Sequence, residues 1–325
     1  MPSSAVHTFT DADDYAAAIR AATIEMIVTR RGQFTAKHIR IDFHRLWMQR
    51  LSENLPRVLH MMADSGRAGI TFRTQPGPSL MWSGVEMRVD HITRHSEGHD
   101  AYQLSSGPAC FAAMSLPVED IASIGATMTG CDLSPPRDTR TVTPPPRAMA
   151  KLQRLHAAVG YLAENAPEII ANPDTARGLE QALIEAMVGC LSVVSVHEDT
   201  VAQRQHELIM RRFRRVLEEK PNQSLYITEI CKIIGVAERT LEVCCQEQLG
   251  VGPKRYLLLR RLQLARRALR EAAPDRTTVT DIATRYGFWH FGRFAGAYQS
   301  LFGEFPSVTL HRQAEQPRNL FAEIG

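Results

Sequence analysis

The hydrophobic pattern of the chain changes from strand-like to helix-like along its length. Between residues 20 and 130, apolar residues gather in short runs separated by Gly, Pro, Asp and Ser. Short runs bounded by such turn residues are typical of strands in a β-sandwich or barrel. The runs that we interpret as strands are 34–41, 45–49, 68–72, 78–82, 85–92, 101–104 and 110–116.

The middle of the chain predicts a connector and two helices. Residues 134–146 are polar and rich in proline, which favours a semi-rigid connector. Apolar residues then recur every three or four positions over 148–163 and 175–194, as in amphipathic helices. Two interpretations of these apolar stripes remain open: packing within the subunit, and contact between two copies of the chain.

From residue 202 onward the pattern predicts short helices separated by Gly or Pro, including two similar helix–turn–helix units. The first spans 225–250, with a turn at Gly235 and a second helix over 237–248. Its inward positions are Ile227, Ile230, Cys231, Ile234, Leu241, Cys244, Cys245 and Leu249.

The second unit spans 278–303, with Thr278 and Asp281 as a capping pair and the turn at Gly287. Its second helix begins near Phe288 and carries Arg293 and His290 beside an apolar face. We assign to that face Phe291, Phe294, Ala297, Tyr298 and Leu301.

A basic helix, residues 251–270, joins the two units. Its predicted packing stripe is Leu258, Leu262, Ala265 and Leu269, and arginines occupy much of the remaining surface. A rigid joining helix would fix the separation of two reading units, as adjacent major grooves about 34 Å apart require. We expect Lys254, Arg255 and Arg261 to contact the phosphate backbone.

Composition and charge agree with a globular nucleic-acid-binding protein. The 325 residues are 44% hydrophobic and 22% charged, and the net charge is +3. Cationic residues concentrate in the C-terminal third, as in a module that binds a polyanion. The sequence has no apolar run long enough for a membrane span and no secretory signal, so we expect a cytoplasmic protein. The six cysteines form no CxxC pair and predict reduced, buried thiols.

Residues 205–310 resemble the AraC/XylS family of bacterial transcriptional regulators. The resemblance rests on LGVGPKRYLLLRRLQLARRAL, from residue 249, and DIATRYGFWHFGRFAGAYQSLFGEFPS, from residue 281. It implies two helix–turn–helix subdomains joined by one helix. It also implies DNA-reading positions at Glu238, Arg239, Glu242, Val243, His290, Phe291, Gly292, Arg293 and Gly296.

The chain departs from the family pattern at a few positions. Tyr226 and Ala237 stand where a polar N-cap is expected, and Cys231 and Cys245 replace an alanine and a core phenylalanine. Phe291 also fits a core position, and His290 also fits a helix cap.

The resemblance implies an α+β multidomain chain. We expect a β-rich, cupin-like effector domain over 1–133 and a linker with dimerisation helices over 134–205. A DNA-binding domain over 206–312 and a tail over 313–325 complete the chain. The expected partners are double-stranded DNA, a small-molecule effector, RNA polymerase and a second copy of the chain.

The N-terminal region has weak candidate sites. His91, His95 and His99 recur every four residues, but a strand end and loop would not align them, so we expect no metal and no cofactor. Two arginine pairs, Arg30 with Arg31 and Arg211 with Arg215, are candidates for binding an effector with phosphate groups, such as a cyclic dinucleotide.

The sequence contains no catalytic motif, and we expect a regulator, in the activator class, rather than an enzyme. Two alternatives remain open. In the first, the protein is a sensor of a phosphorylated nucleotide that controls transcription. In the second, it is a ligand-binding or enzymatic β-domain whose helical tail serves assembly.

Overall fold

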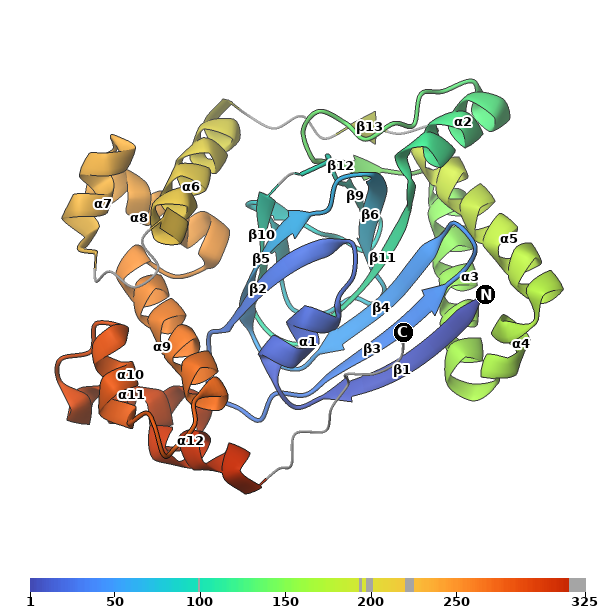
Figure 1. Ribbon diagram of the computed structural model, residues 1–325. Coiled ribbons are helices and arrows are strands. Elements are labelled where there is room, and N and C mark those ends of the chain that lie inside the picture. Colours follow the sequence, from blue (N-terminus) through green and yellow to red (C-terminus); the bar gives the residue numbers. More distant parts are fainter. Residues whose placement is uncertain (99, 193–194, 197–200, 220–224, 316–325) are drawn as a thin grey trace. The chain divides into compact units, whose positions relative to one another are not determined.

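The computed structural model describes residues 1–98, 100–192, 195–196, 201–219 and 225–315 (Figure 1). The chain forms two compact units. The β unit comprises residues 1–26, 34–207 and 248–250, and the helical unit comprises 27–33, 208–247 and the residues from 251 onward. The expected tail, 313–325, lies outside the described residues from 316 onward.

Two antiparallel sheets build the β unit. The larger has the order β1-β3-β4-β11-β6-β9-β12-β13 and the smaller β2-β5-β10-β7-β8. The larger sheet contains β1 (Ser3–Phe9), β3 (Ala36–Asp42), β4 (Trp47–Glu53), β11 (Ala109–Pro117), β6 (Arg67–Arg73), β9 (Ile92–Arg94), β12 (Arg140–Thr143) and β13 (Ser195–Val196). The smaller contains β2 (Ala22–Val28), β5 (Arg57–Ala63), β10 (Asp100–Ser105), β7 (Leu80–Trp82) and β8 (Val85–Glu86).

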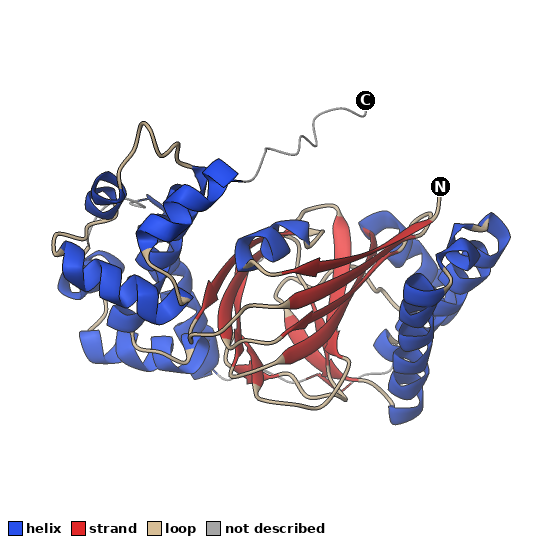
Figure 2. Cartoon of the chain, turned by 90° about the horizontal axis from the view of Figure 1, so that it is seen from below, coloured by secondary structure: helices blue, strands red, loops and turns tan. Residues whose placement is uncertain are grey.

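Five helices accompany the described strands of the β unit: α1 (Ala12–Ala18), α2 (Val118–Thr129), α3 (Pro146–Asn165), α4 (Pro167–Ala171) and α5 (Pro173–Leu191). Figure 2 shows the strands curved around a common interior, with helices against one side. Leu152 and Val159 of α3 and Leu183 and Met187 of α5 join one buried apolar cluster with Met114 of β11. The apolar stripes of the two predicted helices are therefore used for packing within the subunit.

The expected β-rich region is confirmed, but its extent differs from the sequence interpretation. The predicted strand 85–92 is divided between β8 and β9, and β1, β2, β5, α1 and α2 lie where no element was predicted. The Pro-rich segment 134–146 is not a free connector. It contains β12, which pairs with β9 and places Val142 in the apolar core.

A fully buried ion pair ties the smaller sheet to the larger one. Arg57 Nε of β5 donates to Glu53 Oε1 of β4 at 2.6 Å, and both side chains are 0% exposed. Arg57 also donates to Gln103 on β10, to its backbone carbonyl at 3.0 Å and to its side-chain oxygen. Loss of one partner would leave an uncompensated buried charge, which costs about 3–5 kcal/mol.

The helical unit contains α6 (Val201–Glu219), α7 (Ile227–Ile234), α8 (Glu238–Leu249), α9 (Pro253–Glu271), α10 (Val279–Arg285), α11 (Phe291–Phe302) and α12 (Pro306–Glu315), with the start of α6 and the end of α8 meeting the unit boundary. The expected tandem all-α region is confirmed. Four of the six cysteines are buried, and Cys110 and Cys131 are half-buried; all six are free thiols.

Buried neutral histidines make the stability of the β unit depend on pH. Burial lowers the pKa of His38 to about 4, and its Nε2 lies 3.0 Å from Gln49 Oε1. The unfolded chain binds a proton near pH 6.5 whereas the folded chain does not, so stability is lost as pH falls from about 6.5 towards 4.

We predict that His38→Gln reduces this acid sensitivity. Between pH 6 and 4.5, the unfolding free energy of the parent chain should fall more steeply than that of the variant, by about 1.4 kcal/mol per pH unit. Urea denaturation across this pH range measures the difference, and all other titrating groups are shared. Parallel curves for the two proteins would contradict a neutral buried His38.

Candidate nucleic-acid interface

The first helix–turn–helix consists of α7 and α8. Ile227, Ile230 and Ile234 are buried on α7, and Gly235 adopts φ 73°, the left-handed conformation that the sharp turn requires. The missing polar N-cap is compensated by Glu229, whose Oε2 accepts from the Tyr226 backbone N–H at 2.8 Å. Local capping therefore fixes α7 despite the departure at Tyr226.

Helix α8 buries one face and exposes the other. Leu241, Cys244, Cys245 and Leu249 are each 0% exposed, as predicted from their spacing. The expected reading residues Glu238, Arg239, Glu242 and Val243 are all exposed. The four side chains thus lie on the solvent side of α8, where a groove-reading helix must carry them.

Glu242 has a structural contact as well. Its carboxylate lies against Gly252, the N-cap of α9, so closely that a Cβ at this position would overlap it. A carboxylate at a helix N-terminus is stabilised by the helix dipole. Glu242 therefore packs against the start of α9, and Arg239 is the cationic group of this exposed face.

The second helix–turn–helix consists of α10 and α11. The predicted capping pair is present: Thr278 N–H donates to Asp281 Oδ2 at 2.9 Å, and Asp281 N–H donates to Thr278 Oγ1 at 3.1 Å. Gly287 adopts φ 74° in the turn. The second helix begins at Phe291, three residues later than expected, because Phe288 to His290 belong to the turn.

The exposed start of α11 contains the reading positions expected in the second unit. His290, Phe291, Gly292, Arg293 and Gly296 are all exposed, whereas Phe294, Tyr298 and Leu301 are buried. His290 makes no side-chain capping hydrogen bond. A Cβ on Gly292 or Gly296 would meet nothing within 4 Å, so close backbone packing inside the unit does not require either glycine.

Two aromatic residues beside Arg293 differ from expectation. Phe291 is 44% exposed, so its assignment to the packing face is wrong. Trp289 is 69% exposed, and sequence reasoning did not single it out. Its position in the turn, rather than in the helix, removes it from the periodic pattern that would have placed it. Large exposed aromatics are candidates for contact with a partner.

Helix α9 lies between the two helix–turn–helix pairs in sequence and packs against helices that precede and follow it in the chain. Its Tyr256 ring lies 6.0 Å from Phe213 of α6, and α9 also packs against α10 and α12. The buried stripe contains Tyr256, Leu259, Leu262 and Leu269. Leu259 takes the place that we had expected for Leu258, which is only half-buried.

The three cations that we expected to contact phosphates differ in their exposure to solvent. Lys254 and Arg255 are exposed at the start of α9. Arg261 is half-buried: its guanidinium lies 5.1 Å from the centre of the Phe288 ring and points Nη1 at the Gly287 carbonyl, 3.5 Å away. Burial lowers the pKa of Arg261. Arg261 therefore supports the turn of the second unit, in contrast to its expected phosphate contact.

The four candidate effector arginines lie outside the pocket of the β unit. Arg30, Arg31, Arg211 and Arg215 are exposed, and Arg215 Nε pairs with Glu219 Oε1 at 3.1 Å. The β unit has a pocket between its sheets, but none of these four arginines lines it.

The histidine cluster of the β unit is not assembled as a metal site in the described residues. His95 contacts the Thr71 hydroxyl, and His91 Nδ1 lies 3.3 Å from the Glu86 carbonyl. His99 lies outside the described residues. No group of three potential ligands is placed to hold a metal among the residues described. The described helices also include none long and apolar enough to cross a membrane.

The fold and exposed faces of residues 225–312 define a tandem helix–turn–helix DNA-binding module. The profile of a helix-turn-helix domain family matches residues 230–312. The probable thc operon regulatory protein of Rhodococcus erythropolis is 44% identical over 94 residues, 29% of this chain and 28% of that protein. XylDLEGF operon transcriptional activator 3 of Pseudomonas putida is 36% identical over 104 residues, 31% of each chain.

The C-terminal region of this chain belongs to the AraC/XylS family. The chain matches less than one third of the length of these relatives. A crystal structure of the AraC-like transcriptional activator CuxR aligns with 86% of this chain and 100% of its own, at 11% identity and a TM-score of 0.41. A similarity of this size supports no functional argument.

We predict that Arg261→Met destabilises the helical unit by about 1 kcal/mol, because a cation–π contact is lost. Its effect on the salt dependence of DNA binding should be small. The matched control is Arg255→Ala, which should leave stability unchanged and lower the slope of log affinity against log salt by about 0.9. Thermal unfolding measures the stability of both variants, and salt titrations measure the slope for DNA binding. A lowered slope with unchanged stability in Arg261→Met would contradict the role given to Arg261.

Proposed function

We propose that this protein is a sequence-specific, double-stranded DNA-binding transcription regulator whose helices α8 and α11 enter successive major grooves. The observation that carries the proposal is the paired arrangement of two helices, each with one buried face and one exposed face. Arg239 lies on the exposed face of α8, and Arg293 on that of α11. Arginine is the side chain that most often reads guanine in the major groove.

The length of α9 supports binding to two grooves. Its 19 residues correspond to about 28 Å of helix at 1.5 Å per residue. Successive major grooves on one face of DNA are about 34 Å apart. A packed helix of this length can hold two reading helices at a fixed separation close to one turn of DNA.

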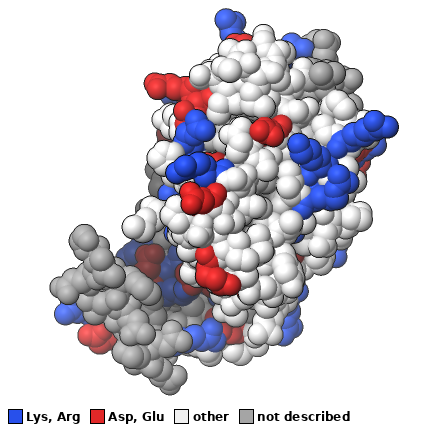
Figure 3. Space-filling model, turned by 90° about the vertical axis from the view of Figure 1, so that its right-hand side faces the viewer, with Lys and Arg blue, Asp and Glu red and all other residues white. Residues whose placement is uncertain are grey.

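We propose further that the β unit binds a small effector and that the regulator acts as a homodimer with RNA polymerase as a partner. The pocket within the β unit supports the first part. For the dimer, α3 to α5 present a largely uncharged surface with small separate groups of charges (Figure 3). Exposed Tyr161 and Ile169 lie on α3 and α4, although the buried stripes of these helices are already used in the core.

We predict that Arg239→Ala and Arg293→Ala each weaken specific DNA binding by about 1–3 kcal/mol, because each removes a base-reading cation. Selection of bound sequences from a random library first gives the target, and titrations against target and scrambled DNA then measure both proteins. Arg215→Ala is the control, since this exposed arginine of α6 already pairs with Glu219.

The proposal requires that discrimination between target and scrambled DNA falls in both reading variants and not in the control. Equal discrimination in all four proteins would overturn the assignment of these helices. Absence of salt-sensitive binding to any DNA would overturn the function itself and favour a helical tail that serves assembly.

A further inference from the structure

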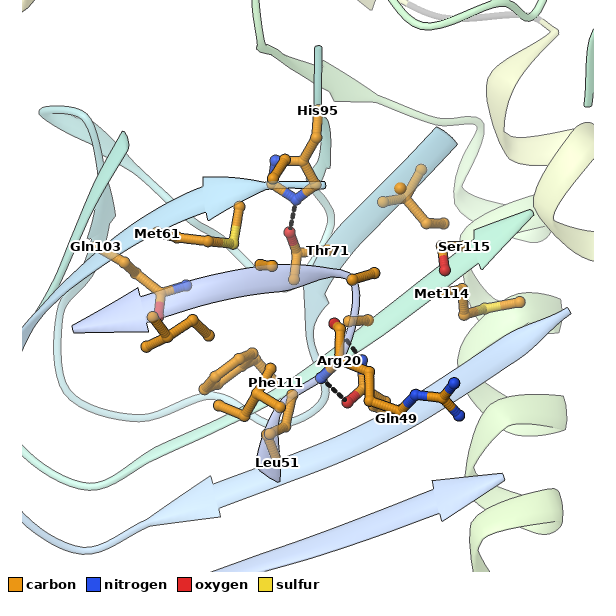
Figure 4. A pocket seen from close by; sticks show the side chains of 18 of the residues that line it. Arg20, Gln49, Leu51, Met61, Thr71, His95, Gln103, Phe111, Met114 and Ser115 are labelled. Atoms are coloured by element: carbon orange, nitrogen blue, oxygen red, sulfur yellow. Dashed lines mark hydrogen bonds between the residues drawn. The ribbon is translucent and has the colours of Figure 1, made fainter. Parts of the chain in front are cut away.

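The pocket of the β unit lies between its two sheets and has a mainly apolar lining. Leu51, Leu59, Met61 and Phe111 form much of its wall, from strands of both sheets (Figure 4). Such a lining favours a ligand with a compact apolar body. The few polar groups in the wall then determine which functional groups the ligand carries.

Gln103 is oriented by the buried ion pair. Its side-chain oxygen accepts from Arg57 Nη2, so its amide nitrogen is fixed as the donor end. That nitrogen has the Met87 sulfur as an acceptor at 3.4 Å, and thioether sulfur accepts weakly. The side chain is 1% exposed and lines the pocket. In Figure 4 the nitrogen lies on the side of Gln103 that faces Thr71.

Trp82 provides a second donor beside Gln103. The two residues are direct partners in the pairing of β7 with β10, so both side chains project from the same face of the smaller sheet. Trp82 is 4% exposed and lines the pocket, and its indole Nε1 is buried with no hydrogen-bond partner. A buried donor without an acceptor is unfavourable, and an acceptor on a ligand would remove this penalty.

The cations of the pocket wall are already engaged. Arg20 Nη1 donates to Asp42 Oδ1 at 2.7 Å, and Arg67 Nη2 donates to the backbone carbonyls of Ser115 at 2.7 Å and Arg45 at 2.8 Å. Both guanidinium groups stack on Trp47, at 3.8 and 3.7 Å from the ring centre. The arginines of the wall therefore already have acceptors. The groups that need an acceptor from a ligand are the neutral donors, the Gln103 amide and the Trp82 indole.

We infer that the pocket binds an uncharged molecule with a compact apolar body and a carbonyl-type oxygen, which accepts hydrogen bonds from the Gln103 amide and the Trp82 indole. This inference rests on the proposed function of the β unit as an effector-binding unit. It names the chemical class of that effector: a small neutral ketone, amide or ester rather than a phosphorylated nucleotide or a carboxylate.

Three probes that share a phenyl ring test the inference on the full chain. Acetophenone carries a neutral acceptor, ethylbenzene carries none, and benzoate carries a charged one. We expect acetophenone to bind at least about fivefold more tightly than either, because one good hydrogen bond contributes about 1 kcal/mol. Calorimetric titration measures the affinity of each probe for the parent chain and for every variant. The indole N–H resonance of Trp82, one of the three tryptophans of the chain, is assigned with Trp82→Phe and locates the bound probe in the parent chain.

Two variants separate recognition from folding. Gln103→Glu keeps an acceptor for Arg57 and removes the amide donor, and Trp82→Phe keeps a ring and removes the indole donor. Each should reduce the preference for acetophenone over ethylbenzene towards unity, while Trp289→Phe, in the exposed turn before α11, leaves it unchanged. Thermal unfolding of each variant establishes whether it is folded. If Gln103→Glu does not fold, Trp82→Phe still tests the inference.

Three results would overturn the inference: equal binding of ethylbenzene and acetophenone, tighter binding of benzoate that Arg67→Met abolishes, or no binding of any probe. The second would identify an anion site at Arg67. DNA binding by the same protein samples is measured separately. Retained DNA binding with failed probe binding refutes only the ligand class, whereas loss of both refutes the proposed regulator.

Discussion

The burial of one face of α9 is the packing constraint on which the proposed interface depends. Leu259, Leu262 and Leu269 are at most 1% exposed, and they hold α9 against its neighbouring helices. A linking helix that packs along its length transmits a fixed spacing, whereas an exposed linker would let the two reading helices move independently. The stability of this apolar stripe and the geometry of DNA recognition are therefore coupled.

Cations on the same helix have different tasks because burial separates them. Arg261 contacts the Phe288 ring and the turn before α11, and Arg266 lies 5.1 Å from the centre of the Phe302 ring. Lys254 and Arg255 remain exposed at the N-terminal end of α9. The exposed pair can meet phosphate without first losing a packing contact, whereas Arg261 and Arg266 would lose their ring contacts. A count of arginines on a basic helix thus overestimates its electrostatic contact with DNA.

The helical unit could be predicted well from sequence because its signals are local. Residues such as Ile230 and Leu241 repeat at helical spacing, and Gly235 and Gly287 mark turns that need positive φ. The contact between Arg261 and Phe288 joins positions far apart in sequence, so periodicity could not reveal it. Trp289 was missed because it lies in a turn.

The β unit was predicted less completely because its pairings are non-local. Strand β1 alternates poorly between buried and exposed positions, and β12 lies within a Pro-rich segment whose composition indicates a linker. The partnership of Glu53 with Arg57, and through it the orientation of Gln103, depends on three strands meeting. Glu53 and Arg57 are only four residues apart, but Gln103 lies 46 residues beyond Arg57 in the sequence. The fixed orientation of Gln103 in the pocket therefore became visible only in the folded chain.

Footprinting of the full chain on a selected target tests the two-groove arrangement most directly. A reader with α8 and α11 in successive grooves should contact guanines in two major-groove segments about 10 base pairs apart on one face of the DNA. Arg239→Ala should lose contact in one segment and Arg293→Ala in the other. A single contacted segment, or loss of the same segment in both variants, would contradict the arrangement.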